Sequence, residues 1–146
     1  MKKLLMISIM LLVGALSVSA QTYCYKYLFN VDENGMKFED KIFGGSNKYC
    51  YYTFTNNKNA FYESDKNGID INTSLGLSPS TPAVYSKTEN GILIYKKKGL
   101  SEYYLVSPDY SRINLKYKPI LRNRWETAVW ERTTEPEKEH APTQLY

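Results

Sequence analysis

The side chains best suited to catalysis are scarce in this sequence. Its one histidine, His140, lies in the charged, proline-containing segment that ends the chain. Histidine is the commonest general base and metal ligand, so a Ser-His-Asp or Cys-His site is not expected in the folded part. Carboxylates are plentiful, but nothing in the sequence pairs Glu39, Asp40, Glu63 or Glu102 with a second acid. We expect a non-enzymatic protein with no catalytic residue, no metal and no cofactor.

Two cysteines, Cys24 and Cys50, are the next possible source of chemistry. Their spacing differs from the Cys-x-x-Cys pattern of redox and metal sites. An even number of cysteines in an exported chain favours a disulfide, which would contribute about 3–4 kcal/mol by closing this loop. We therefore expect a Cys24–Cys50 disulfide, with two buried thiols as the alternative.

Tyrosine is unusually frequent, with 14 residues in a chain of 146. It combines a large apolar ring with a hydroxyl, and it therefore suits half-wet surfaces that bind sugars or partner chains. The candidate ligand-binding residues are Tyr23, Tyr25, Tyr27, Tyr49 and Tyr51. The alternative role is structural, because tyrosine favours strands and its ring can fill a small barrel with the hydroxyl at the rim.

The first twenty residues predict a cleaved export signal of bacterial type. Lys2 and Lys3 precede an apolar run at 4–16, and Val18 and Ala20 are the small residues expected before a cleavage site. Cleavage after Ala20 predicts a periplasmic or secreted protein without stable membrane insertion. An uncleaved membrane anchor is the alternative, although the apolar run is short for a membrane span.

The rest of the chain is predicted to be one domain at 21–134 followed by a disordered tail at 135–146. The full chain has 19 basic and 15 acidic side chains, and loss of Lys2 and Lys3 leaves it nearly balanced. We therefore expect no nucleic-acid partner, and we interpret the Lys96–Lys98 cluster as part of a solvated face.

Alternation of apolar and polar residues in short runs predicts an all-β domain. Odd positions from 23 to 31 are aromatic or β-branched, and Ile113, Leu115 and Tyr117 alternate with polar residues. Further strands are expected at 49–55, 61–62, 84–85, 92–95 and 103–106.

Asn-Gly pairs at 34–35, 67–68 and 90–91 predict type I′ turns, in which both central residues have positive φ. The first and third connect hairpins of 27–31 with 36–38 and of 84–87 with 92–95. Residues 56–59 and 107–111 are also predicted to be hairpin loops.

Two segments depart from this pattern. Residues 64–82 form a long polar connection with one short strand expected at 69–71. Residues 120–132 have features of both a strand and a helix, and their tryptophans and β-branched residues favour the strand.

A meander of about eight or nine short strands favours a small up-and-down barrel, because closure removes free sheet edges. The long connection at 64–82 makes a two-sheet sandwich the alternative.

These features predict an exported, non-enzymatic binding module. Its Tyr-rich surface or barrel interior would bind a small ligand or a glycan. The alternative is an accessory or structural protein of the cell envelope that acts through protein–protein contacts.

Overall fold

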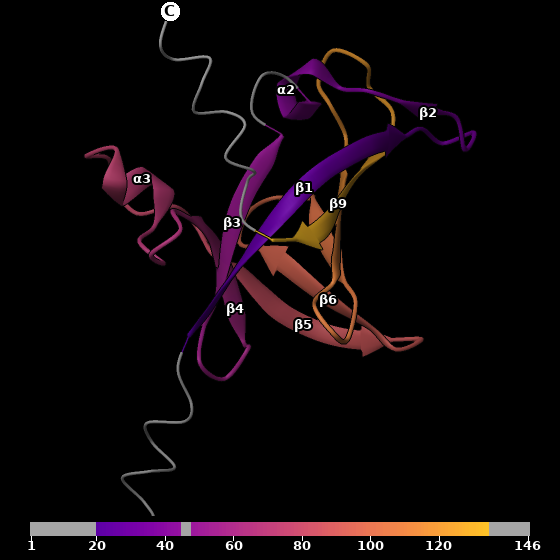
Figure 1. Cartoon of the computed structure of the whole chain (residues 1–146). Coiled ribbons are helices and arrows are strands. Elements are labelled where there is room, and N and C mark those ends of the chain that lie inside the picture. The colour runs from indigo at the N-terminus through magenta and orange to yellow at the C-terminus, as the bar shows by residue number, and fades with distance from the viewer. Residues whose placement is uncertain (1–19, 45–47, 135–146) are drawn as a thin grey trace, which may run out of the picture.

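The computed structural model of the chain describes residues 20–44 and 48–134. The predicted signal, apart from Ala20, and the predicted tail with His140 lie outside the described residues. The described chain forms nine strands and two short helices (Figure 1). In chain order these are β1 (Gln21–Val31), β2 (Lys37–Phe38), α2 (Lys41–Gly44), β3 (Tyr49–Phe54), β4 (Ala60–Ser64), α3 (Ile71–Ser74), β5 (Ala83–Glu89), β6 (Ile92–Lys97), β7 (Tyr103–Val106), β8 (Arg112–Tyr117) and β9 (Glu126–Thr133). Neither of these helices has the length and apolar character that a membrane-crossing helix needs.

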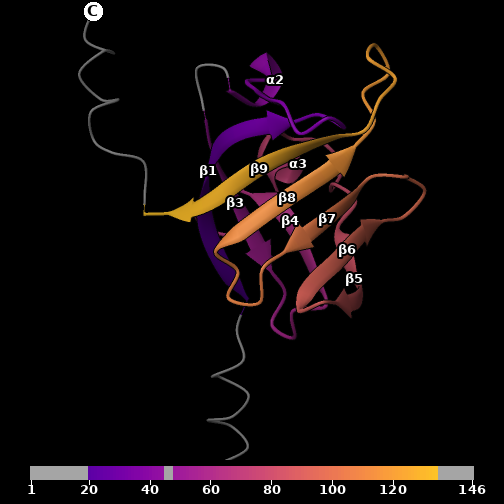
Figure 2. The same cartoon turned by 90° about the vertical axis from the view of Figure 1, so that its right-hand side faces the viewer.

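The strands form one antiparallel sheet that closes into an eight-stranded barrel. Their order is β1-β3-β4-β5-β6-β7-β8-β9, and β9 pairs with β1 to complete the ring. Strand β2 is an additional strand that pairs with the end of β1. Figure 2 shows β9, β8, β7 and β6 side by side across one wall. The all-β prediction and the up-and-down barrel are confirmed.

Strand β1 closes the barrel because it pairs with two strands along its length. Residues 21–26 pair with β3, and residues 24–31 pair with β9. The register with β9 shifts between Tyr27 and Phe29, which marks a bulge. Tyr25 and Tyr27 are buried before the bulge, whereas Asn30 is buried after it. The prediction that all odd positions from 23 to 31 share one face is therefore wrong beyond Tyr27.

Aromatic rings fill the barrel interior, and Phe61 is central among them. Its ring centroid lies 4.9 Å from Phe54, 5.0 Å from Tyr95 and Tyr104, and 5.4 Å from Tyr52. Three of these four contacts are edge-on, the arrangement that aromatic quadrupoles favour. An eight-stranded barrel is just wide enough to be filled by its own side chains.

Antiparallel connectivity gives the barrel two distinct ends. We call the end with the β1–β3, β4–β5, β6–β7 and β8–β9 connections the upper end, and the opposite one the lower end. Backbone carbonyls satisfy the tyrosine hydroxyls at the lower end: Tyr25 donates to Tyr110 O at 2.6 Å, and Tyr95 donates to Lys58 O at 2.7 Å. The hairpin loops thus seal the lower end.

The three Asn-Gly turns differ in conformation. Only at Asn90-Gly91 do both residues have positive φ, at 52° and 81°, so the type I′ prediction is confirmed there and wrong at the other two pairs. In those two turns the carboxylates of Asp32 and Asp65 each accept hydrogen bonds from two backbone N–H groups within the turn. The third turn has Thr88 at the equivalent position and lacks this carboxylate.

The two ambiguous segments are resolved. In 120–132, strand β9 begins at Glu126 and confirms the strand interpretation for the second part, while the first part is a connection. The strand expected at 69–71 is reduced to an isolated β-bridge between Asp70 and Ser64, because α3 begins at Ile71. The Asp70 side chain caps this helix by accepting hydrogen bonds from the N–H groups of Asn72 and Thr73.

The predicted disulfide between Cys24 and Cys50 is absent from the described residues. The register opposes Cys24 to Tyr51 and Tyr25 to Cys50. Because consecutive side chains of a strand point to opposite faces, the Cys50 side chain points inward with Tyr25, and Cys24 points outward with Tyr51. The two sulfur atoms therefore lie on opposite faces of the barrel wall.

We expect Phe61→Ala to lower the free energy of unfolding by about 3–5 kcal/mol, because the variant leaves a cavity among four rings. Urea unfolding followed by far-UV circular dichroism would measure the change. The control is Val84→Ala, on the exposed side of β5, where the loss should be below about 0.5 kcal/mol. Equal losses in the two variants would contradict the central position of Phe61.

Candidate functional site

The barrel wall has a notch at its upper end between β4 and β5. These strands pair only at Ala60 and Phe61, so residues 62–64 of β4 continue beyond the start of β5. Strand β5 starts at Ala83, level with the end of β6. The β4–β5 connection carries α3, which projects to the left of the barrel in Figure 1, and its residues Ile71, Asn72, Ser80 and Thr81 lie beside this break.

A cavity of about 220 Å³ occupies the notch. Aromatic residues from β3, β4 and β7 form part of its lining, and two charged side chains and the β4–β5 connection supply polar groups. The lining residues are Tyr52, Phe61, Tyr62, Glu63, Ile71, Asn72, Ser80, Thr81, Lys97 and Tyr104. The cavity therefore joins the aromatic core to polar groups at the rim.

Three polar groups of this cavity have no hydrogen-bond or ion-pair partner among the described residues: the Glu63 carboxylate, the Lys97 ammonium and the Tyr104 hydroxyl. The Lys97 nitrogen lies 5.7 Å from the centre of the Tyr104 ring. Tyr104 is only 5% exposed. Among the described residues, the buried side-chain polar atom without a hydrogen-bond partner is Asn114 Oδ1, so the Tyr104 hydroxyl keeps access to solvent through the cavity and is available to a ligand.

Burial and nearby charges shift the acidity of these groups. Removal of water raises the pKa of the Glu63 carboxyl, while the positive charge of Lys97 opposes the rise and Asp70 adds to it. Burial, assisted by Glu102 and Glu63, raises the pKa of the Tyr104 hydroxyl. Tyr104 is therefore a neutral group that can both donate and accept a hydrogen bond.

A second hollow of about 210 Å³ adjoins the notch and shares Tyr52 and Glu63 with it. Cys50 also lines this hollow, and burial raises the pKa of its thiol. A thiol is a weak nucleophile while it stays protonated, so Cys50 is unsuited to covalent chemistry.

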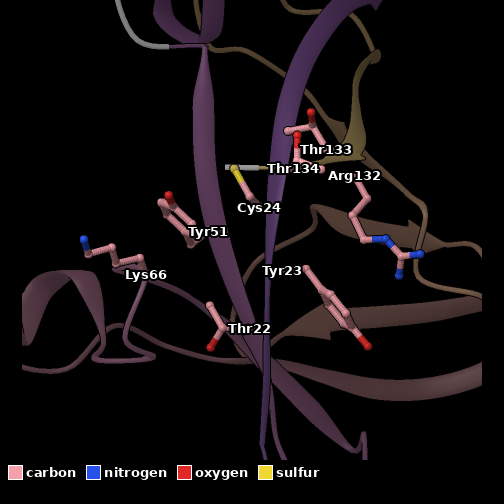
Figure 3. A pocket seen from close by; sticks show the side chains of 8 residues that line it. All are labelled: Thr22, Tyr23, Cys24, Tyr51, Lys66, Arg132, Thr133 and Thr134. Atoms are coloured by element: carbon pink, nitrogen blue, oxygen red, sulfur yellow. The ribbon is translucent and has the colours of Figure 1, made fainter. Parts of the chain in front are cut away.

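A larger hollow, about 600 Å³, lies on the outer surface around β1 (Figure 3). Tyr23 and Arg132 lie on one side of this strand, and Cys24, Tyr51 and other lining residues lie on the other. Arg132 already covers the Tyr23 ring at 5.1 Å and donates a hydrogen bond to a backbone carbonyl. This hollow straddles a strand and does not enclose a ligand-sized space, so we favour the notch.

The predicted ligand-binding tyrosines do not form one surface. Tyr25 and Tyr27 are 0% and 2% exposed and belong to the core. The hydroxyl of Tyr27 donates to Asn30 Oδ1 at 2.6 Å, as part of the packing of the upper end. These two tyrosines have the structural role that the sequence left as the alternative.

The other three candidates are partly exposed at separate places. Tyr23 stacks against Tyr110 at the lower end, with 6.2 Å between ring centroids. Tyr49 lies in the second hollow, with the Lys26 nitrogen 5.8 Å from its ring centre, and Tyr51 lines the outer hollow. None of the five lines the notch.

The residues that do converge in the notch were not predicted from the sequence. The alternation of side chains between the two faces of a strand (strand parity) could have located two of them. Glu63 is two residues after the buried Phe61 in β4, and Lys97 is two residues after the buried Tyr95 in β6. Side chains two apart in a strand share a face, so both side chains lie on the inner faces of their strands. At this open end of the barrel Glu63 is exposed and Lys97 is half-buried. A charged residue at an inward position is the signal that was missed.

A second cluster of charges at the upper end is structural. Arg122 Nη2 donates to Asp40 Oδ2 at 2.7 Å, and Arg122 Nε donates to Glu126 Oε2 at 2.6 Å. Arg124 also donates to Glu126, at 3.0 Å, and the Tyr117 hydroxyl donates to Asp40 at 3.1 Å. Both carboxylates are buried and fully engaged, and no described group of three His, Cys, Asp or Glu side chains could hold a metal ion.

Hydrogen bonds reverse the effect of burial on these two carboxylates. Burial raises the pKa of Asp40, but bonds from the Ile42 N–H, Arg122 and Tyr117 outweigh it. Burial likewise raises the pKa of Glu126, and bonds from Arg122 and Arg124 outweigh it. The pKa of each carboxyl is therefore lower than usual in the folded protein.

Comparison of the chain with protein-family models, with curated proteins and with solved structures found no significant match.

The Asp40–Arg122–Glu126 cluster predicts a loss of stability in acid. A carboxyl whose folded-state pKa lies below its unfolded value stabilises the fold above the ordinary carboxyl range. This contribution is lost as the pH falls below about 4 and through the lower folded pKa. We expect Arg122→Met to be less stable than the parent at pH 7, with the two stability curves converging as the pH falls.

Urea midpoints measured across the acid range would check this expectation. The matched control is Arg112→Met, whose partner Glu131 is exposed and whose stability curve should nearly coincide with that of the parent. Curves for Arg122→Met and the parent that remain parallel in acid would contradict the assigned cause.

Proposed function

We propose that the protein is an exported, non-enzymatic binding module that takes a small polar ligand into the notch between β4 and β5. The observation that carries the proposal is the set of three polar groups, Glu63, Lys97 and Tyr104, that line one cavity without protein partners. Backbone carbonyls accept the hydroxyls of Tyr25 and Tyr95, whereas the hydroxyl of Tyr104 opens to the cavity, where a ligand can reach it.

The chemistry of the lining favours a saccharide unit. A carboxylate accepts hydrogen bonds, an ammonium donates them and a phenol does both. Sugar hydroxyls can form hydrogen bonds with all three groups. Aromatic rings beside these groups suit the apolar C–H face of a sugar. The cavity volume of about 220 Å³ is below the ~300–1,000 Å³ of pockets for drug-sized ligands. The ligand that fits is therefore about the size of a single ring.

The barrel closure gives little support to the alternative function through strand-edge contacts. Strand β9 pairs with β1, and β2 has only two residues. Strand β5 pairs with β4 only at Ala83 and Val84, so its residues 86–89 also have an open edge. Such short edges offer few backbone hydrogen bonds to a partner strand. The notch therefore remains the better-supported binding site.

Export is part of the proposal, and the position of β1 supports it. The first strand begins at Gln21, directly after the predicted cleavage site. The nine strands of the described residues lie between Gln21 and Thr133, so removal of residues 1–20 would leave each of them in place.

Ligand binding can be tested with a panel of monosaccharides, with free amino acids as a comparison class, by saturation-transfer NMR. For a monosaccharide that binds, we expect Glu63→Gln, Lys97→Met and Tyr104→Phe each to weaken binding about tenfold, because each removes one hydrogen-bonding group. The matched control is Lys96→Met, since Lys96 precedes Lys97 on the same strand and points to the outer face.

Two results would contradict the proposed site. One is an absence of binding across the whole monosaccharide panel. The other is that Tyr104→Phe, Lys97→Met and Lys96→Met bind the monosaccharide with equal affinity. Binding of amino acids alone would retain the notch but reject the saccharide.

The export proposal predicts that the protein recovered from the periplasm or medium of an expressing bacterium begins at Gln21. N-terminal sequencing or intact mass would measure this directly. The control is Ala20→Pro, which should block cleavage because signal peptidases require a small residue before the cut. A mature protein that retains Met1 would contradict the proposal.

A further inference from the structure

Exposed apolar side chains are concentrated at the upper end of the barrel. Most of the large apolar residues that are exposed in the described chain belong to the connections at this end. They are Met36, Ile42, Ile69, Leu75, Leu77, Leu100, Ile120, Leu121 and Trp125, whereas Val84 and Tyr85 lie on the wall. The β8–β9 connection contains the most exposed of these residues, since Ile120 is 95% and Leu121 98% exposed.

This connection projects from the upper end as a convex turn (Figure 2). Hydrogen bonds fix the backbone of this turn on both sides of its tip, which is Ile120 and Leu121. On one side the Asn123 N–H donates to Pro119 O at 2.8 Å, with Asn123 at a φ of 48°. On the other, the Trp125 N–H donates to Glu33 Oε1 at 2.8 Å. The apolar tip is therefore presented by a structured turn.

The two arginines of the turn strengthen this arrangement. Arg122, directly after the tip, is held by Asp40 and Glu126, and Arg124 is held by Glu126 and Asp32. Because these side chains are directed back to the barrel, Ile120 and Leu121 are directed away from it. Neither aliphatic side chain buries appreciable surface, so neither stabilises the fold, and polar residues would serve the turn equally well.

Neighbouring residues extend the apolar tip into a mixed apolar and basic surface. A hollow of about 290 Å³ separates the turn from the β6–β7 connection, and Leu100, Lys118 and Ile120 line it. Lys118 is exposed, as is Lys98 in the same β6–β7 connection as Leu100, and Glu102 is the carboxylate in the lining. The Trp125 ring lies at the base of the turn, 6.3 Å from the Tyr103 ring.

The shape and charge of this surface determine which partner fits it. A stable protein interface buries about 800 Å² on each partner, and a single protruding turn offers far less. A lipid bilayer accepts a small apolar insertion at its interface, where tryptophan is favoured and lysines attract anionic headgroups. We propose that the Ile120–Leu121 turn, with Leu100, Lys98 and Lys118, docks the barrel reversibly on the surface of an anionic membrane.

This docking differs from the membrane insertion that the sequence argues against, because side chains of one turn enter only the interface and no segment spans the bilayer. It is also independent of the ligand proposed for the notch, since neither Ile120 nor Leu121 lines that cavity.

Vesicle co-sedimentation tests the proposal with the chain from Gln21 to Tyr146, which keeps every strand of the barrel. The vesicles are phosphatidylcholine mixed with phosphatidylglycerol, or phosphatidylcholine alone. We expect the parent to bind the mixed vesicles and the double variant Ile120→Ser/Leu121→Ser to bind at least about tenfold more weakly. The emission of Trp125 should shift to shorter wavelength on binding, whereas Trp130 is already buried.

Two further variants separate the apolar and electrostatic contributions. Lys98→Gln/Lys118→Gln should reduce binding to the mixed vesicles, and added salt should weaken binding of the parent. Val84→Ser, an exposed apolar position on the wall, should bind as the parent does. Thermal unfolding should be the same in all of these proteins, because every changed side chain is exposed.

The proposal is overturned if the parent fails to bind mixed vesicles at low salt. It is also overturned if Ile120→Ser/Leu121→Ser binds as tightly as Val84→Ser.

Discussion

A closed eight-stranded barrel must fill its own interior, and this requirement organises the whole protein. Closure depends on β1, which pairs with β3 through its first half and with β9 through its second. The enclosed space is filled by rings from nearly every strand, with Phe61 in contact with four of them. Many of the rings are tyrosines, so the barrel must also satisfy their hydroxyls. The frequency of tyrosine thus reflects how the core is built.

The two ends of the barrel meet that requirement differently. At the lower end, hairpin carbonyls accept the hydroxyls of Tyr25 and Tyr95. At the upper end, the Arg122 cluster closes the side formed by β1, α2 and β9, while the late start of β5 leaves the wall open beside Glu63 and Lys97. Stability and binding potential are therefore separated along the barrel axis. The upper end is the irregular one, because the three longest connections, β1–β3, β4–β5 and β8–β9, leave from it.

Strand parity predicted much of the fold but little of the candidate site. Alternation at Ile113, Leu115 and Tyr117, and the turn at Asn90-Gly91, are local features, and the structure contains both. Parity failed where a bulge intervened, since Asn30 occupies the inward position expected for Phe29. It was not applied to Glu63 and Lys97, because charged residues in strands are ordinarily assigned to the wet face. The disulfide prediction was wrong for a related reason. The number of cysteines and export to an oxidising compartment do not determine which face of a strand each sulfur occupies.

The sequence by itself determined the all-β class and the hairpin order, because period-two alternation and Asn-Gly turns act over a few residues. It favoured a small barrel but left a two-sheet sandwich open, and the pairing of β9 with β1 decided between them. Only the tertiary structure decided the positions that depend on register between strands distant in sequence. It placed Cys24 and Cys50 on opposite faces, opened the wall between β4 and β5, and turned Ile120 and Leu121 outward through the bonds of Arg122. The physical reason is that register and closure are set by all strands together, so a one-residue shift moves a side chain from the core to solvent.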